Sequence, residues 1–184
     1  MTVVIWVVEG TWPACVDAAR ALAAGDPEPV LLHVLAEDVA GTAHGAFAGL
    51  LGRGHRDADP GAEVARLAAE SAAGLLDRAE ERLGRPARRD VRAGRVEREV
   101  VAACAGADLL VCARDGDRTR LGPRSLSPAT RFAVDHAPCP VLLVWPEQPP
   151  ALDSIPEPPR PHQGPPPPHK RQPPHKHQPP PPPR

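Results

Sequence analysis

Four short apolar runs are the feature of this sequence that most constrains its fold. They are Thr2–Val8, Val30–Leu35, Asp108–Cys112 and Val141–Trp145. Continuous apolar runs of this length, bounded by glycine, proline or charged residues, are typical of strands buried on both faces, and such strands lie inside parallel sheets. Because parallel strands cannot be joined by a tight turn, the segments between them should form crossover helices.

Those segments carry helical patterns. Thr11 is placed as the N-cap of a helix that follows the first run. Ala62–Leu83 has its apolar residues on one face of a long amphipathic helix. A further helix follows Gly94, and Pro128–His136 forms a short last helix. Glu37–Pro60, rich in alanine and glycine, is expected to form a mobile lid or a short helix.

The polar segment Ala87–Ala93 completes the set of strands. Val91 is its only large apolar residue, and a strand so poor in apolar residues belongs at a sheet edge, where arginine discourages further pairing. The alternation of strands and helices predicts an α/β fold, a doubly wound five-stranded parallel sheet with helices on both faces. The strand that starts at Thr2 should be central.

Proline sets the end of the domain. Of 27 prolines, 18 lie at or after Pro146, where missing backbone donors and the lack of apolar residues oppose folding. Residues 1–147 are therefore predicted to form one domain, and residues 148–184 a disordered Pro/His-rich tail. Its PPPPH and PPPPPR segments are of the kind that polyproline-reading partners bind, and its four histidines are of the kind that bind metal adventitiously. A flexible solubilising tail is the plainer alternative.

Charge and cysteine content narrow the partners and the compartment. Residues 1–147 carry 17 Lys+Arg against 21 Asp+Glu, and the tail carries 5 against 2, so neither part predicts a nucleic-acid surface. The four cysteines lack metal-finger spacing and are expected to be buried thiols in a reducing cytoplasm. The first ten residues lack the cationic start of a secretion signal, and no run is long enough to span a membrane.

Three motifs together resemble the universal stress protein family. They are EGTW after the first strand, LLHV in the second, and DHAPCPVLLVW at the end of the domain. The resemblance covers Thr2–Trp145. It implies a strand order of 3-2-1-4-5, a homodimer formed through the last strand (Val141–Trp145), and a regulatory or protective role more often than a catalytic one. Many members of the family bind ATP, and some do not.

The nucleotide-binding pattern of that family, G-x2-G-x9-G-[ST], is eroded in this chain. Ala113 stands at the first glycine, Gly116 matches the second, and the third falls near Leu126 or Ser127, neither of which is glycine. The glycines of the pattern let backbone amides approach phosphate oxygens, and the last Ser or Thr adds a hydroxyl at a helix N-terminus. One glycine of three is kept. The loss at Leu126 and Ser127 is the more damaging one, because backbone amides should face the phosphates there.

The resemblance also marks positions elsewhere along this edge of the sheet. Glu9 stands where nucleotide-binding members usually have Asp, and its turn with Gly10 and Thr11 is implied to meet a ribose or a magnesium ion. Val34 matches the position whose backbone meets adenine. The implied ligand is ATP or AMP, with Mg²⁺ as a companion.

Arginine replaces the missing glycines in the loop after the fourth strand. Arg114 and three further arginines, together with Ser125 and Ser127 before the last helix, have the chemistry of an anion site, since guanidinium forks bind phosphate bidentately. The alternative is a solvated loop whose arginines pair with its own aspartates, and exposed pairs of that kind contribute little energy.

Two functions from different classes follow. The first is a regulatory protein that binds a small adenine nucleotide at the carboxyl ends of the strands. The second is a dimeric interaction module with a silent loop and a tail that recruits a partner or a metal. Slow ATP hydrolysis is a third and weaker option, because no general base is visible. His33 is interpreted as a core histidine and His136 as a cation that satisfies the last carbonyls of a helix.

Overall fold

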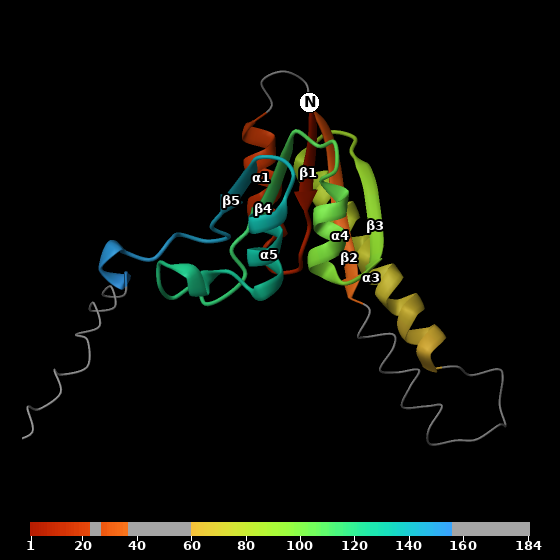
Figure 1. Cartoon of the computed structure of the whole chain (residues 1–184). Coiled ribbons are helices and arrows are strands. Elements are labelled where there is room, and N and C mark those ends of the chain that lie inside the picture. The colour runs from red at the N-terminus through yellow and green to blue at the C-terminus, as the bar shows by residue number, and fades with distance from the viewer. Residues whose placement is uncertain (23–26, 37–59, 156–184) are drawn as a thin grey trace, which may run out of the picture.

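A five-stranded, all-parallel sheet forms the centre of the molecule (Figure 1). The computed structural model describes residues 1–22, 27–36 and 60–155. The strand order is β3-β2-β1-β4-β5, which confirms the predicted topology. The strands are β1 (Thr2–Trp6), β2 (Glu28–Ala36), β3 (Arg88–Gly94), β4 (Leu109–Ala113) and β5 (Val141–Val144). The segment predicted as a lid or short helix lies, apart from Pro60, outside the described residues.

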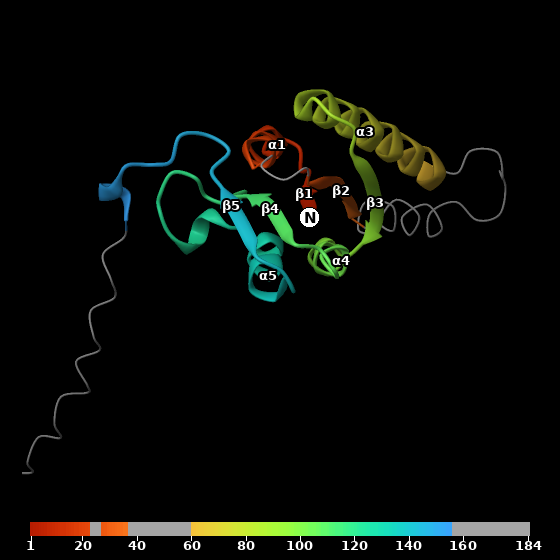
Figure 2. The ribbon, with the colours of Figure 1, turned by 90° about the horizontal axis from the view of Figure 1, so that it is seen from above.

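Helices cover both faces of this sheet, as Figure 2 shows from above. α1 (Trp12–Ala21) and α3 (Pro60–Leu83) lie on one face. α4 (Val96–Ala103) and α5 (Pro128–His136) lie on the other. None of the helices in the described ranges has the length and apolar character that crossing a membrane requires.

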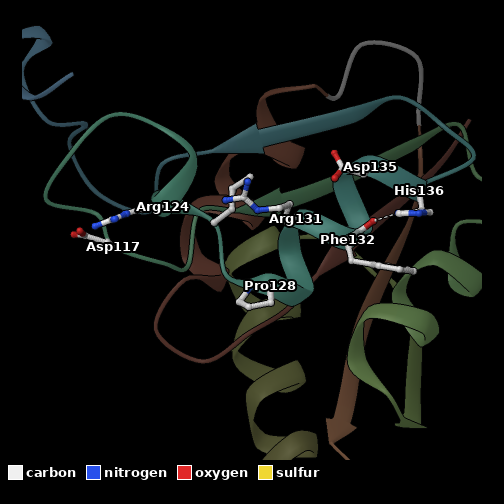
Figure 3. A pocket seen from close by; sticks show the side chains of 8 residues that line it. Asp117, Arg124, Pro128, Arg131, Phe132, Asp135 and His136 are labelled. Atoms are coloured by element: carbon white, nitrogen blue, oxygen red, sulfur yellow. Dashed lines mark hydrogen bonds between the residues drawn. The ribbon is translucent and has the colours of Figure 1, made fainter. Parts of the chain in front are cut away.

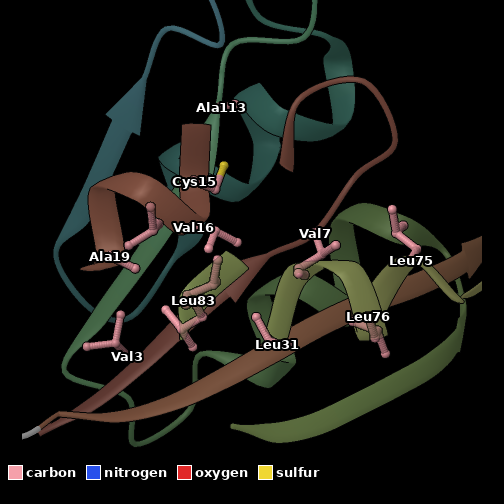
Figure 4. Packing of buried hydrophobic residues seen from close by; sticks show 13 residues of the cluster. Val3, Val7, Cys15, Val16, Ala19, Leu31, Leu75, Leu76, Leu83 and Ala113 are labelled. Atoms are coloured by element: carbon pink, nitrogen blue, oxygen red, sulfur yellow. The ribbon is translucent and has the colours of Figure 1, made fainter. Parts of the chain in front are cut away.

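The side chains of β1 supply both halves of the core. Val3, Ile5 and Val7 join the cluster under α1 and α3, while Val4 and Trp6 join the cluster under α4 and α5. This alternation is the period-two geometry of a strand. Both faces of β1 are apolar, which confirms that it is the central strand. Figure 4 shows the first cluster, where Leu31, Leu75, Leu76, Leu83 and Val16 fill the space between sheet and helices.

The polar strand β3 lies at one edge of the sheet, as its composition predicts. Its side chains alternate between half-buried and exposed, and its arginines make ion pairs. Arg89 bridges to Asp77 and Glu80 of α3. The hydrogen bond from the Arg89 guanidinium, followed by that from the Ala87 amide, lowers the pKa of Glu80. Ion pairs therefore hold β3 against α3, because β3 offers little apolar surface for packing.

The described chain continues beyond Glu147, where the sequence analysis ends the domain. Residues 148–155 include a 3-10 helix, η2 (Leu152–Ser154). The Leu121 amide donates to the Ser154 hydroxyl at 3.1 Å, and Arg118 pairs with Glu147 at 3.3 Å. The first residues after the predicted boundary therefore contact the loop after β4, and the boundary itself stays a prediction. Disorder beyond Ile155 stays a prediction.

A pair of leucines in α3 tests this core. Leu76 is 1% exposed and Leu67 is 51% exposed, so Leu76→Ala should cost about 2–5 kcal/mol of unfolding free energy through lost burial and a cavity. Leu67→Ala makes the same chemical change on the same helix and should cost about 0.5 kcal/mol or less. Urea denaturation measures both, and equal losses would contradict the placement of α3.

Candidate functional site

The carboxyl ends of β1, β2 and β4 bring the predicted site residues to one edge of the sheet. The register pairs Trp6 with Leu32, and Ile5 with Val111. Val34 lies two residues after Leu32, and Ala113 two residues after Val111, so both positions are level with the point where β1 gives way to its turn. The crossover helices that lead to β2 and β3 cover one face of the sheet, and those that lead to β4 and β5 cover the other. The strand order therefore reverses at β1, and open α/β sheets bind ligands at such a switch point.

The turn after β1 is closed by its own backbone. The amides of Thr11 and Trp12 both donate to the Val8 carbonyl, at 3.1 and 3.0 Å. Gly10 has a φ of 79°, in the left-handed region that favours glycine. Thr11 is the N-cap residue of α1, as predicted, but its hydroxyl donates to the Val8 carbonyl instead of accepting from a helix amide. The side chain of Glu9 is 74% exposed and lies 3.5 Å from the Arg78 guanidinium.

Val34 offers its backbone and not its side chain to this edge. The side chain is 8% exposed and belongs to the core cluster under α4 and α5. In a parallel sheet, successive residues direct their backbone groups to alternate neighbours. The Leu32 carbonyl accepts from the Val7 amide, so the backbone groups of Val34 also face β1, yet the pairing of β1 with β2 ends at Leu32.

His33, the residue before Val34 in β2, makes a side-chain hydrogen bond to the end of β1. Its Nδ1 lies 2.9 Å from the Val7 carbonyl oxygen and donates to it, since a carbonyl only accepts. This contact ties β2 to the end of β1. His33 is predicted to be a core histidine, but it is half-buried and belongs to neither core cluster.

The loop between β4 and α5 folds back on itself. The amides of Gly116 and Asp117 donate to the carbonyls of Ser125 and Arg124, at 3.0 and 2.8 Å. A Cβ atom at Gly116 would clash with the Arg124 carbonyl oxygen. Gly116 is therefore required by the contact between the two arms of the loop. A short 3-10 helix, η1 (Pro123–Ser125), completes the returning arm.

Ala113, which stands at the first glycine of the family pattern, is accommodated without strain on the loop. It is 6% exposed and belongs to the core cluster under α1 and α3. Its methyl group therefore packs into the interior at the end of β4 and does not project toward the space outside the strand ends.

A carboxylate occupies the start of α5. Asp115 accepts from the Ser127 amide at 2.9 Å through Oδ1, and from the hydroxyls of Ser127 and Thr130 at 2.8 Å through Oδ2. The Ser127 hydroxyl in turn caps the helix by accepting from the Thr130 amide at 3.2 Å. Sequence reasoning missed Asp115. The spacing of Ser127 and Thr130 was the available signal for a capped helix start, but nothing in it selects Asp115 as the partner.

The loop arginines divide between internal contacts and the surface. Arg114 donates to the hydroxyl of the fully buried Ser125, and its guanidinium carbon lies 4.8 Å from the centroid of the Trp145 ring. Ser125 donates to the Gly122 carbonyl at 2.6 Å. With Arg118 paired to Glu147, two of the four arginines have partners within the protein. Neither partner is an aspartate of the loop, which differs from the self-paired interpretation, because Asp115 and Asp117 accept from Ser127, Thr130 and Thr119.

The described residues hold neither a ready metal centre nor an activated thiol. No group of three or more His, Cys, Asp or Glu side chains in those ranges is arranged to hold a metal ion. Burial raises the pKa of Cys112, just before Ala113, to about 12, and the nearby Asp115 carboxylate adds to the effect. A thiol of this kind stays protonated and is a poor nucleophile.

A separate open groove of about 720 Å³ runs along the outer side of α5 (Figure 3). None of the nine predicted site residues lines it. His136 stacks on Phe132 with ring centroids 4.0 Å apart, and its Nδ1 donates to the Phe132 carbonyl at 2.9 Å. This bond confirms His136 as a helix-end residue. The lining is Asp117, Arg124, Leu126, Pro128, Arg131, Phe132, Asp135 and His136.

A doubly wound parallel sheet of order 3-2-1-4-5, with its loops gathered at the carboxyl edge, defines a Rossmann-like α/β protein. The family model described as "Universal stress protein family" matches residues 9–144, most of the chain. This protein therefore belongs to the universal stress protein family.

Two solved structures, of hypothetical proteins MJ0577 and PH0823, show the same fold. Hypothetical protein MJ0577 is 17% identical, with a TM-score of 0.60 over 80% of this chain and 96% of that chain. Hypothetical protein PH0823 is 19% identical, with a TM-score of 0.54 over 78% and 94%. A universal stress protein family protein from Arabidopsis thaliana, with AMP bound, is 17% identical, with a TM-score of 0.48 over 83% and 94%. No curated protein sequence matches the chain significantly.

The cap of α5 can be tested without any ligand. Ser127→Ala removes the hydroxyl that accepts from Thr130 and donates to Asp115, so it should cost about 0.5–2 kcal/mol of unfolding free energy. Ser71→Ala, at an exposed position inside α3, is the matched control and should cost nothing, because alanine favours a helix interior. Chemical denaturation that finds the two variants alike would contradict the capping role of Ser127.

Proposed function

We propose that this protein is a regulatory or protective member of its family that binds an adenine nucleotide, ATP or AMP, at the carboxyl edge of the sheet. The observation that carries the proposal is the convergence, beside β1, of the Glu9 turn, the backbone of Val34 and the loop that ends at Ser127. These segments come from distant parts of the chain and meet at the switch point, where sheets of this type bind ligands.

Each segment has a role that its chemistry supports. The adenine ring would hydrogen-bond the backbone of Val34, whose groups face β1 beyond the end of its pairing. Glu9 would meet the ribose hydroxyls or a Mg²⁺ ion, since its exposed pair with Arg78 holds it weakly. Gly10 and Thr11 shape that turn.

The phosphate end of the ligand would lie toward the loop after β4. Arg114 supplies positive charge there, and the hydroxyl of the buried Ser125 holds its guanidinium in place. Ser127 marks the start of α5 at the far end of the loop. Ala113 and Gly116 set the path of the backbone, with Ala113 in the core and Gly116 at the contact of the two loop arms.

The proposed role is binding and not catalysis. Hydrolysis of ATP would need a group that activates water, and no general base for it is visible in the part of this edge that the structure describes. The cysteines of the described residues are free, and three of them are buried, which supports the cytoplasmic location that the sequence analysis expects. The metal-binding and partner-binding roles of the tail lie outside the described residues and stay predictions.

Isothermal titration calorimetry with AMP and ATP, with and without Mg²⁺, tests the proposal. We expect saturable heat and a rise in melting temperature, because a ligand that binds only the folded state stabilises it. Arg114→Ala should weaken binding by about tenfold or more, the usual effect of losing one charged hydrogen bond. Arg88→Ala removes the same charge from the opposite, amino end of β3 and should leave affinity unchanged. The proposal fails if neither nucleotide gives heat or a melting shift.

We also propose that β5 pairs with its own copy in a homodimer. β5 is the edge strand opposite β3. Its Val144 carbonyl accepts from the Arg114 amide and the Pro140 carbonyl accepts from Leu110, so even-numbered residues face β4. By alternation Val141 and Leu143 direct their backbone groups to the open edge, and antiparallel pairing of two such edges would give an isologous dimer.

Leu143 offers a matched test of this pairing. Leu143→Pro removes an edge amide while leaving the bonds to β4, so light scattering at micromolar concentration should give the mass of a monomer. Leu143→Ala loses the same side chain but keeps the amide, and it should remain dimeric like the wild type. A monomeric wild-type protein, or a dimeric proline variant, would rule out assembly through β5.

A further inference from the structure

The Asp115 side chain, a carboxylate of the protein itself, occupies the start of α5. We propose that the Asp115 carboxylate stands in the place of a ligand phosphate and thereby selects adenine compounds with little or no phosphate charge, adenosine or AMP, over ATP. The inference rests on the proposed function, because it concerns the ligand of that same site.

The hydrogen bonds to Asp115 are those that a phosphate group would need. Ser127 occupies the [ST] position of the family pattern, and both its amide and its hydroxyl point at the Asp115 carboxylate, at 2.9 and 2.8 Å. The Thr130 hydroxyl adds a third bond at 2.8 Å. Helix N-termini bind carboxylate and phosphate through the same donors. These donors therefore cannot serve a ligand phosphate while Asp115 stays bound.

Other donors of the loop are likewise used within the chain. A phosphate cradle works by offering several free backbone amides at once. Here the amides that already donate to acceptors of the protein are those of Arg114, Gly116, Asp117, Thr119, Leu121, Ser125, Leu126 and Ser127. A phosphate chain would have to break several of these bonds to enter the loop.

The charges around Asp115 reinforce this selection. Its three hydrogen-bond donors are neutral, so they leave its negative charge in place. Arg114 is directed to Ser125 and Trp145, and Arg118 to Glu147. Every phosphate group added to the ligand would bring more negative charge toward this carboxylate, and opposition between like charges grows with that charge. Adenosine avoids the conflict, and AMP meets it least among the nucleotides.

A charge-removal pair in the same loop tests the inference. Asp115→Ala frees the start of α5. Asp117→Asn removes a carboxylate that, among the described residues, accepts from Thr119 alone, at 3.0 and 2.6 Å. Calorimetry on the full chain would compare adenosine, AMP and ATP, each with and without Mg²⁺. We expect the wild type and Asp117→Asn to bind adenosine and AMP more tightly than ATP. Asp115→Ala should gain about 10- to 100-fold for ATP, the range of one charged hydrogen bond, with adenosine unchanged.

Asp115→Asn covers the case in which the alanine variant does not fold. It keeps the shape of the side chain and one acceptor for the Ser127 amide but has no charge, so it should show a smaller gain for ATP. Circular dichroism confirms that each variant is folded before its affinity is compared.

The outcomes separate this inference from the proposed function. If the wild type binds nothing and Asp115→Ala binds ATP, the proposed function fails while the role of Asp115 stands. If the wild type binds ATP as tightly as AMP, and removing Asp115 changes neither, the inference is overturned and the function stands. Tighter binding of Mg²⁺-ATP by the wild type than by Asp115→Ala would also overturn it, since the carboxylate would then help to hold the metal. Folded variants that bind no ligand would overturn it as well.

Discussion

The double burial of β1 is the constraint on which the rest of the structure depends. β1 has parallel strands on both sides and helices on both faces, and its side chains alternate between the two core clusters. A strand in that position has no polar face to give to water. Its neighbours β2 and β4 run parallel to it, and the helices that join the parallel strands cover its two faces. The carboxyl ends of the strands consequently meet at one edge, and this is why the Glu9 turn, Val34 and the loop after β4 are neighbours.

The fold could be predicted because it is specified by patterns that persist along the chain. The apolar runs of β1 and β2, the long amphipathic face of α3 and the polar character of β3 each indicated an element of the correct type. The residues at which strands and helices end were harder to predict from the sequence. β1 ends at Trp6 and not at Val8, because its pairing stops where the turn begins. Ser154 and Glu147 contact the loop after β4, and the apolar pattern of the sequence could not show these polar contacts.

The candidate site was only partly predictable for the same reason. The glycine pattern showed where a phosphate loop would lie and that it was eroded at Ala113 and Leu126. It could not show that Gly116 serves the closure of the loop, or that Asp115 rather than Asp117 reaches the start of α5. Two aspartates and four arginines in one loop allow many pairings. The path of the backbone determines which of them form, and the sequence pattern does not give that path. In the structure, many backbone amides of this loop donate to acceptors within the protein.

The central claim is that Asp115 holds the position of a phosphate while the adenine end of the site stays available. A crystal structure of the full chain with AMP tests it most directly. The account predicts adenine against the backbone of Val34, with Asp115 still accepting from the Ser127 amide and hydroxyl. A phosphate oxygen bonded to Ser127, with the Asp115 side chain turned away, would contradict it.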